Sequence, residues 1–281
     1  MKYCIQYYRN FKYFNDIDEI IITYNDKDVN VLNFLEQFSE TKTRIILDAN
    51  KIDNIEDNLN IFIAAREVHK NLAIKIKLDS NEALLLYENN IPFFFDDFVD
   101  NWDTLISFIN AKVSDVYIVN ELGFELKDVS KVCKENNVNV RVFPNVAQTG
   151  SKIKNLETIK SFFIRPEDID IYEPYVDVCE FFGPLDRQSV LYDIYTDKKW
   201  IGDLRELIIG LKEPLKSKYL MPCFGEERLN CGKKCYQDKC IICDKISTIA
   251  KQLEEANLEI KIEEKENEYQ INEASNENKT G

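Results

Sequence analysis

Histidine is nearly absent from this chain, since His69 is the only one in 281 residues. A histidine-dependent triad, a zinc hydrolase with histidine ligands and an iron oxygenase with two histidine ligands are all poorly compatible with a single imidazole. His69 falls in a predicted helix within one turn of Arg66 and Lys70, and we expect it to be solvated or partly buried. Acid–base chemistry would therefore fall to carboxylates, tyrosines, lysines or thiolates.

Glycine and basic residues are also scarce. The eight glycines nowhere form G-x-G-x-x-G or a P-loop, so nucleotide binding through either motif is not expected.

Lysine and arginine total 36 against 50 acidic residues, and this formal net charge of −14 predicts no general attraction to DNA or anionic membranes. No stretch approaches the roughly 20 apolar residues of a membrane span, and the start MKYCIQYYRNFKYF lacks the apolar run of a secretion signal. We therefore expect a cytoplasmic protein with no membrane partner.

Short β-branched or aromatic runs do occur, and they alternate with helical patterns, as in repeated βα units around a parallel sheet. Hydrophobic residues are 44% of the chain, enough for a sizeable core. Nine strands are predicted, one more than an eight-stranded barrel needs. They span residues 2–8, 19–24, 44–50, 72–79, 91–97, 115–121, 138–145, 161–168 and 175–183.

Helices are predicted between these strands by apolar residues three and four apart. They cover residues 29–38, 55–70, 81–90, 102–111 and 124–137, and a closing helix is predicted over 201–215. Strands recur about every 25 residues or less, so one closed barrel is preferred to two domains, with a doubly wound open sheet as the alternative. We predict an α/β TIM-like barrel over 1–213, a cysteine-rich metal-binding loop over 214–244, and a helix with a disordered acidic tail over 245–281.

Polar side chains follow almost every predicted strand, where a parallel βα fold gathers its reactive groups. They are Asp48, Asn50, Lys77, Asp79, Asp96, Asp97, Asn120, Glu121, Asn145, Gln148, Arg165, Glu167, Asp168 and Glu180. Asp and Asn at such positions also cap the next helix, which is the simpler interpretation for Asp79 or Asp97. Glutamate is a poor cap, so Glu121 and Glu180 are the stronger candidates for proton transfer in a polar pocket.

Five of the eight cysteines lie close together near the end of the chain. Cys231, Cys235, Cys240 and Cys243 read C-x3-C-x4-C-x2-C, a spacing that lets one loop bind a single metal centre. Cys223 or Cys179 could add a ligand from outside that loop. Cys4 and Cys133 are expected to be small buried hydrophobes.

Sulfur ligands without a nearby histidine restrict the metal to four-cysteine zinc or an iron–sulfur cluster. Zinc knuckles usually pair two C-x2-C units, and here only Cys240 and Cys243 form one. The spacing therefore favours a cluster, with zinc as the alternative.

The second half of the chain resembles a known family. The passages DVYIVNELGFELKDVSKVCKENNVNVRVFPNVAQT, FFIRPEDIDIYEPYVDVCEFFG and WIGDLRELI, followed by the cysteine loop, are similar to the collagenase-like peptidases of unassigned mechanism, family number thirty-two, and to related barrel proteins. The most specific pieces are IRPED and YEPYVDVCEF. The first hundred residues match only in their βα rhythm.

That resemblance implies a TIM-like barrel and, as in several relatives, a [4Fe–4S] cluster supporting oxygen-independent hydroxylation of a quinone precursor or of RNA. It further implies that a set of polar residues lines the mouth of the barrel and that the four loop cysteines hold the metal. The implied mouth residues are Asn120, Glu121, Asn145, Arg165, Glu167, Asp168 and Glu180. The peptidase signature is incomplete, because EFFGPLDRQSV keeps Glu180 but lacks the later cysteines.

The leading hypothesis is therefore a redox enzyme that acts on a small molecule, a peptide or RNA, with Glu121 or Glu180 moving protons. The alternatives are a non-catalytic, zinc-stabilised scaffold that recruits a protein partner, and a peptidase. The sequence leaves the substrate and the oligomeric state open.

Overall fold

The strands of the barrel are short and buried, as expected where helices cover one face of a sheet and the barrel interior covers the other. The computed structural model describes residues 1–7, 17–118, 126–147, 163–211, 216–220 and 224–230, together with 246, 248, 249 and 252. Its strands are β1 (Lys2–Gln6), β2 (Glu19–Thr23), β3 (Arg44–Asp48), β4 (Leu72–Ile76), β5 (Phe93–Phe95), β6 (Phe98–Val99), β7 (Asp115–Ile118), β8 (Asn139–Val142) and β9 (Val178–Glu180).

These strands form one parallel sheet in the order β5-β4-β3-β2-β1-β9-β8-β7-β6. The two ends of that order meet, because β5 and β6 are separated in the chain only by Asp96 and Asp97. The Ser114 backbone N–H, just before β7, also donates to the Phe93 carbonyl in β5 at 2.7 Å. Thus β5 and β6 act as one broken strand, and eight strands close a TIM-like barrel, as the sequence predicts. A doubly wound sheet would instead reverse its strand order midway.

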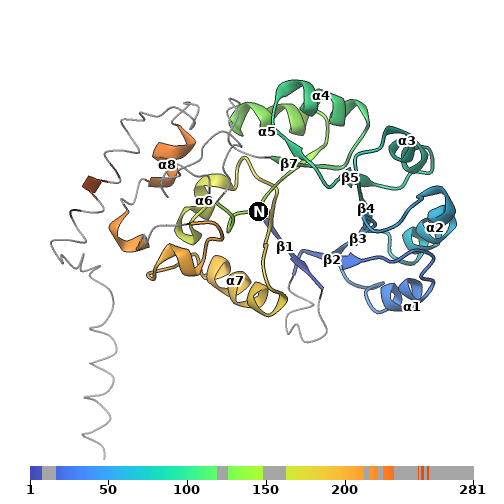
Figure 1. Ribbon diagram of the computed structural model, residues 1–281, viewed down its shortest axis with the longest axis horizontal. Helices are drawn as coiled ribbons and strands as arrows, with labels where there is room; N and C mark the ends of the chain where they lie inside the picture. Colours follow the sequence, from blue (N-terminus) through green and yellow to red (C-terminus); the bar gives the residue numbers. More distant parts are fainter. Residues whose placement is uncertain are drawn as a thin grey trace, which may run out of the picture.

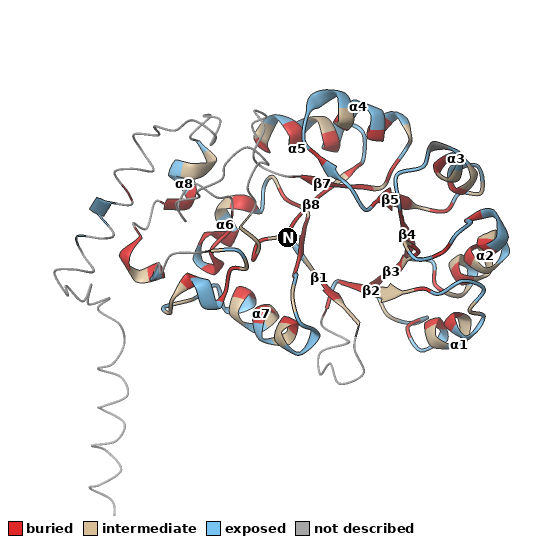
Figure 2. Ribbon diagram, in the orientation of Figure 1, coloured by how far each residue is buried: buried red, intermediate tan, exposed pale blue. Residues whose placement is uncertain are grey.

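Helices lie outside this ring of strands (Figure 1). The crossover helices are α1 (Asn30–Glu36), α2 (Leu59–Val68), α3 (Ser80–Glu88), α4 (Trp102–Asn110), α5 (Leu126–Glu135) and α6 (Ile169–Tyr172), and α7 (Leu185–Asp197) follows the last strand. A further short helix, α8 (Phe224–Leu229), comes just before the cysteine loop. The helix faces toward the strands are buried and the outer faces exposed (Figure 2).

Two predicted elements are wrong. Residues 163–165 of the predicted strand 161–168 are not in a strand, and a 3-10 turn, Pro166–Asp168, follows them. Pro166 lacks the backbone N–H that a ladder needs, which is consistent with this result. Within the predicted closing helix 201–215, the described residues contain only the 3-10 turn Leu204–Glu206. The helix in this part of the chain is α7, which begins after Pro184 and ends before the predicted closing helix would start.

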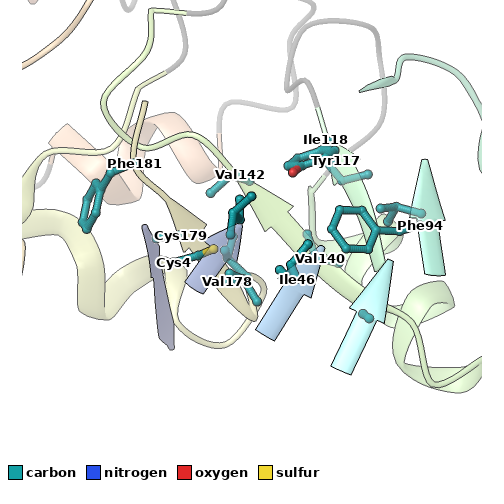
Figure 3. Packing of buried hydrophobic residues seen from close by; sticks show 14 of the residues in the cluster. Cys4, Ile46, Phe94, Tyr117, Ile118, Val140, Val142, Val178, Cys179 and Phe181 are labelled. Carbon is teal, nitrogen blue, oxygen red and sulfur yellow. The ribbon is translucent and has the colours of Figure 1, made fainter. Parts of the chain in front are cut away.

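Apolar side chains from the strands fill the space under the helices. Figure 3 shows part of the buried core, with Val140 and Val142 of β8 and Val178 of β9 among the labelled residues. In the described part of the chain, no helix is long and apolar enough to cross a membrane. The predicted domain boundaries at 213 and 244 fall among residues outside the described ranges.

Candidate functional site

The interior of the barrel is crossed by charged side chains rather than filled only by apolar ones. Arg141 on β8 is fully buried, and its Nη1 atom lies 2.6 Å from Glu19 Oε2 and 3.2 Å from Asp115 Oδ1. Its Nη2 atom lies 3.0 Å from Glu180 Oε2. Burial alone would lower the pKa of Arg141, but the carboxylates, with Glu19 the strongest, hold it well above its usual value. A permanent cation thus joins β2, β7, β8 and β9.

A second guanidinium belongs to the same network, at the amino end of β3. Arg44 of β3 forms a bidentate pair with Asp115 at 2.8 and 2.7 Å, and it also contacts Ser114 and Glu19. Although burial opposes it, the Arg44 charge lowers the pKa of Asp115 well below its usual value. Asp115 is therefore a fixed carboxylate, and this part of the network joins opposite sides of the barrel.

The open end of the interior is a cavity of about 400 Å³ at the carboxyl ends of the strands, which we call the mouth cavity. It receives side chains from β1, β2, β3, β4 and β9 and from the residues that follow β5, β8 and β9. Its lining residues are Gln6, Ile21, Asp48, Lys75, Asp96, Phe143, Glu180, Phe181, Phe182, Gly183 and Gln188. Of the predicted strand-end residues, Asp48, Asp96 and Glu180 are thus brought together.

Lys75 is the cation of the mouth cavity. It lies in the middle of β4 between two isoleucines, and its Nζ atom is 3.3 Å from Asp48 Oδ2 and 3.3 Å from Asp96 Oδ1. Burial would lower its pKa, but the neighbouring carboxylates, led by Glu180, raise it above the usual value. Lys75 is therefore an ammonium at neutral pH and not a free amine nucleophile.

Glu180 connects the mouth cavity with the buried network. Its Oε2 atom accepts hydrogen bonds from Tyr117 Oη at 2.7 Å and from Arg141 Nη2 at 3.0 Å. No donor from the described residues contacts Oε1. Oε1 is also not one of the fully buried side-chain atoms that lack a hydrogen-bond partner. Oε1 therefore opens on the cavity that Glu180 lines. One oxygen is fixed by the protein, and the other is free to act on a ligand.

Asn145 holds two loops at the mouth instead of lining the cavity. Its side chain accepts a hydrogen bond from the Phe182 N–H at 3.0 Å and donates to the Phe182 carbonyl at 2.7 Å. The next residue, Gly183, has φ of +126°, a conformation that side chains rarely adopt. Together these features fix the turn after β9, so Asn145 is a positioning residue.

Arg165 and Asp168, also predicted for the mouth, are instead paired with each other. Their side chains are buried and form two hydrogen bonds of 2.7 and 2.8 Å. Helix α8 covers this pair, since Phe224 lies over the Arg165 guanidinium at 4.9 Å and Gly225 packs against Asp168. Glu167 accepts a hydrogen bond from the Ser217 hydroxyl. This segment therefore anchors the chain that leads to the cysteine loop.

Cys179 is buried on β9 next to Glu180, and alternation along the strand places it on the face opposite the cavity. Its Sγ atom lies 3.0 Å from the Met1 sulfur, and burial raises the pKa of the thiol well above its usual value. The other proposed residues lie outside the described ranges. They are Asn120, Glu121, Cys223, Cys231, Cys235, Cys240 and Cys243.

The capping expectations are confirmed in part. The Asp79 side chain caps α3 by accepting from two backbone N–H groups, whereas α4 is capped by Asn101 and not by Asp97.

His69 is almost fully buried and directly follows α2, with its Nε2 donating to the Thr43 carbonyl at 2.9 Å. The expectation of a solvated or partly buried helical residue was therefore wrong on both counts, although a structural role holds.

Five buried charged residues were not predicted from the sequence, because they do not lie at the carboxyl ends of the predicted strands: Glu19, Arg44, Lys75, Asp115 and Arg141. A signal was present in two cases. Lys75 interrupts LAIKI and Arg141 interrupts VNVRV, and a charge at the centre of a buried apolar strand needs a partner.

No known family model and no curated protein matches this chain. Two solved structures are similar in part. One is an aldolase from TTHB1 acting on 4-hydroxy-2-oxoglutarate and 2-dehydro-3-deoxyphosphogluconate, with 12% identity, coverage of 70% of this chain and 92% of that chain, and a TM-score of 0.38. The other, from Agrobacterium tumefaciens, is named as a candidate glycerophosphoryl diester phosphodiesterase, with 6% identity, coverage of 59% and 63%, and a TM-score of 0.37. The TIM-like assignment therefore rests on the strand order and the closure of the sheet.

Proposed function

We propose that this chain is an enzyme whose substrate binds in the mouth cavity and whose cysteine loop carries a sulfur-bound metal centre, an iron–sulfur cluster. The observation that carries the proposal is the convergence of Lys75, Glu180, Asp48 and Asp96 in one cavity at the carboxyl ends of the strands. This is the face on which TIM-like barrels place their chemistry. Burying charges of both signs costs desolvation free energy, and clusters of such groups occur most often at functional sites, which supports a functional site here.

The two central side chains would have different roles. Glu180, fixed through Oε2, would accept or donate a proton at the substrate through Oε1. The Lys75 ammonium would stabilise negative charge that develops on a substrate oxygen, because it is held in place by two carboxylates. Tyr117 and Arg141 would act through Glu180 as positioning residues.

The metal centre would be held by Cys231, Cys235, Cys240 and Cys243, whose thiolates suit a [4Fe–4S] cluster and, alternatively, zinc. Such a cluster would supply electron transfer for a redox modification, for which the family resemblance suggests oxygen-independent hydroxylation. Support for its position comes from Asn230, directly before Cys231, which accepts a hydrogen bond from Lys127. Lys127 lies in the first turn of α5, the helix that follows β7, so Asn230 lies on the same face of the barrel as the mouth cavity.

The metal is tested by anaerobic purification with iron, sulfide and zinc analysis and an absorption spectrum. The wild type should be brown and contain iron and sulfide, and the Cys231→Ser, Cys235→Ser double variant should lose both. Cys133→Ala, which removes a buried thiol of α5, is the matched control and should keep the colour. A colourless wild type with one zinc would reject the redox role and favour the scaffold.

The catalytic role is tested with Glu180→Gln. If the chain is an enzyme, this change should abolish turnover of its substrate and leave the metal content unchanged. Unchanged function would instead favour the non-catalytic scaffold.

A further inference from the structure

The mouth cavity has more negative than positive charge. Three carboxylates, of Asp48, Asp96 and Glu180, face one ammonium, of Lys75, which leaves a formal charge of −2. The ammonium already contacts both aspartates at 3.3 Å. An anionic ligand would have to compete with these partners and approach Glu180, so the cavity disfavours carboxylate or phosphate groups.

The cavity atoms that have no hydrogen-bond partner among the described residues are mainly acceptors. Glu180 is only 6% exposed, yet its Oε1 has no donor among the described residues. The backbone N–H and the side-chain Nε2 of Gln6 both donate hydrogen bonds to protein atoms. No donor from the described part of the chain contacts Gln6 Oε1. A ligand that donates hydrogen bonds would satisfy both oxygens.

Aromatic rings complete the lining. Phe143, Phe181 and Phe182 border the cavity, but the Phe181 ring packs on the other face of the sheet, against Tyr3 and Tyr195 with ring centres 5.7 and 5.1 Å apart. The Phe143 ring is held by parallel stacking on Tyr117, with ring centres 5.2 Å apart. The faces of such rings attract cations. A carboxylate beside aromatic faces is suited to an organic ammonium group.

A metal ion is a poorer occupant. Among the described residues, no group of three or more histidine, cysteine or acidic side chains is placed to hold one. The Lys75 ammonium also occupies the position between Asp48 and Asp96 that a cation would take.

We propose that the mouth cavity binds a small molecule through a primary ammonium group, which donates to Glu180 Oε1 and Gln6 Oε1 and lies against the rings of Phe143 and Phe182. The remaining N–H of Lys75 is then available for a hydroxyl oxygen on the same molecule. The substrate class is therefore an amino alcohol or a similar hydroxylated amine. This inference rests on the mouth cavity being the substrate site of the proposed function.

The test uses three probes that share a four-carbon chain with one terminal hydroxyl group and differ only at the other end: aminobutanol, butanediol and hydroxybutanoate. Binding to the full chain is measured by calorimetry at constant pH and ionic strength. Aminobutanol should bind at least about tenfold more tightly than butanediol, and hydroxybutanoate should bind most weakly. Equal or tighter binding of hydroxybutanoate, or no saturable binding of aminobutanol, would overturn the proposal.

Variants locate the site. Glu180→Gln and Asp96→Asn should each weaken aminobutanol binding by about tenfold or more, and Asp96 is exposed enough for its variant to fold. Asp57→Asn is the matched control, because Asp57 is an exposed carboxylate that does not line the cavity, and it should bind like the wild type. If Asp57→Asn weakened binding, or if Asp96→Asn did not, the probe would bind outside the mouth cavity. A protein that contains iron and sulfide but binds no amine would reject this inference alone.

Discussion

At the scale of single residues, Arg141 is the side chain on which the barrel interior depends most. It is fully buried and pairs with Glu19, Asp115 and Glu180, which are themselves nearly or fully buried. In Arg141→Met the three carboxylates lose this counter-ion, so we expect the free energy of unfolding to fall by about 3–5 kcal/mol. Urea unfolding at neutral pH measures this loss.

The matched control for Arg141→Met is Arg205→Met. Arg205 also pairs with an aspartate, Asp203, but it lies at the surface. Exposed ion pairs contribute about 1 kcal/mol or less, so this variant should unfold almost like the wild type. Equal losses in the two variants would contradict the account of the network.

Asp115 predicts how stability depends on pH. Its pKa is lowered in the folded state by Arg44, whereas the unfolded value is about 3.9. A lowered pKa contributes stability above the unfolded value, and that contribution is lost as the pH falls toward the folded value. The stability difference between wild type and Asp115→Asn should therefore be large at pH 7 and shrink below about pH 4. A difference that stays constant in unfolding curves across this range would show that Asp115 is not the group responsible.

The buried thiols predict a pattern of chemical reactivity. Burial raises the pKa of Cys133 to about 12, and it raises the pKa of Cys4 well above its usual value. Since the thiolate is the reactive form, neither thiol should react with iodoacetamide at pH 8 in the folded protein. Both should react fully in urea, as peptide mass spectrometry can show. Rapid labelling of Cys133 before unfolding would mean that α5 does not keep this thiol buried against the rest of the protein.

At the scale of elements, eight of the nine predicted strands are present, because a run buried on both faces of a sheet is recognisable from its own apolar composition. The prediction failed where a tertiary contact decides the structure. Phe163 and Ile164 have the apolar character of strand residues, but the next residue, Arg165, pairs with Asp168 and lies under Phe224, 59 positions later in the chain. Local pattern carries no information about such a partner.

Helix α8 depends on a close approach at Gly225. A Cβ atom there would lie 2.7 Å from Asp168 Cγ, inside the buried pair with Arg165. Gly225→Ala should therefore loosen α8, speed hydrogen exchange over residues 224–230 and cost about 1–3 kcal/mol of stability. Glu227→Ala on the exposed face of the same helix is the control and should change neither measurement. Unchanged exchange in Gly225→Ala would mean that Asp168 moves aside without cost.

At the scale of the whole molecule, the candidate site could be predicted only in part. The carboxyl ends of parallel strands meet on one face by topology, so Asp48, Asp96 and Glu180 were predictable. Which polar residues enter the cavity depends on side-chain direction and on loop packing. For that reason Asn145 and Arg165 turned out to stabilise loops, and Lys75, within a strand, completes the site.

The closed sheet also separates the stability of the barrel from the cysteine loop. The strands that close the sheet and most of the buried core come from residues 2–211, before the loop begins. We therefore expect the Cys231→Ser, Cys235→Ser variant, which would lack the proposed metal, to keep the far-ultraviolet circular dichroism of the wild type. Its melting temperature should change by less than about 2 °C, which corresponds to under about 1 kcal/mol at this size. A fall of about 10 °C in the melting temperature would show that the fold depends on the metal, as a zinc-stabilised scaffold requires. That result would exclude a reactive centre added to a barrel that is stable without it.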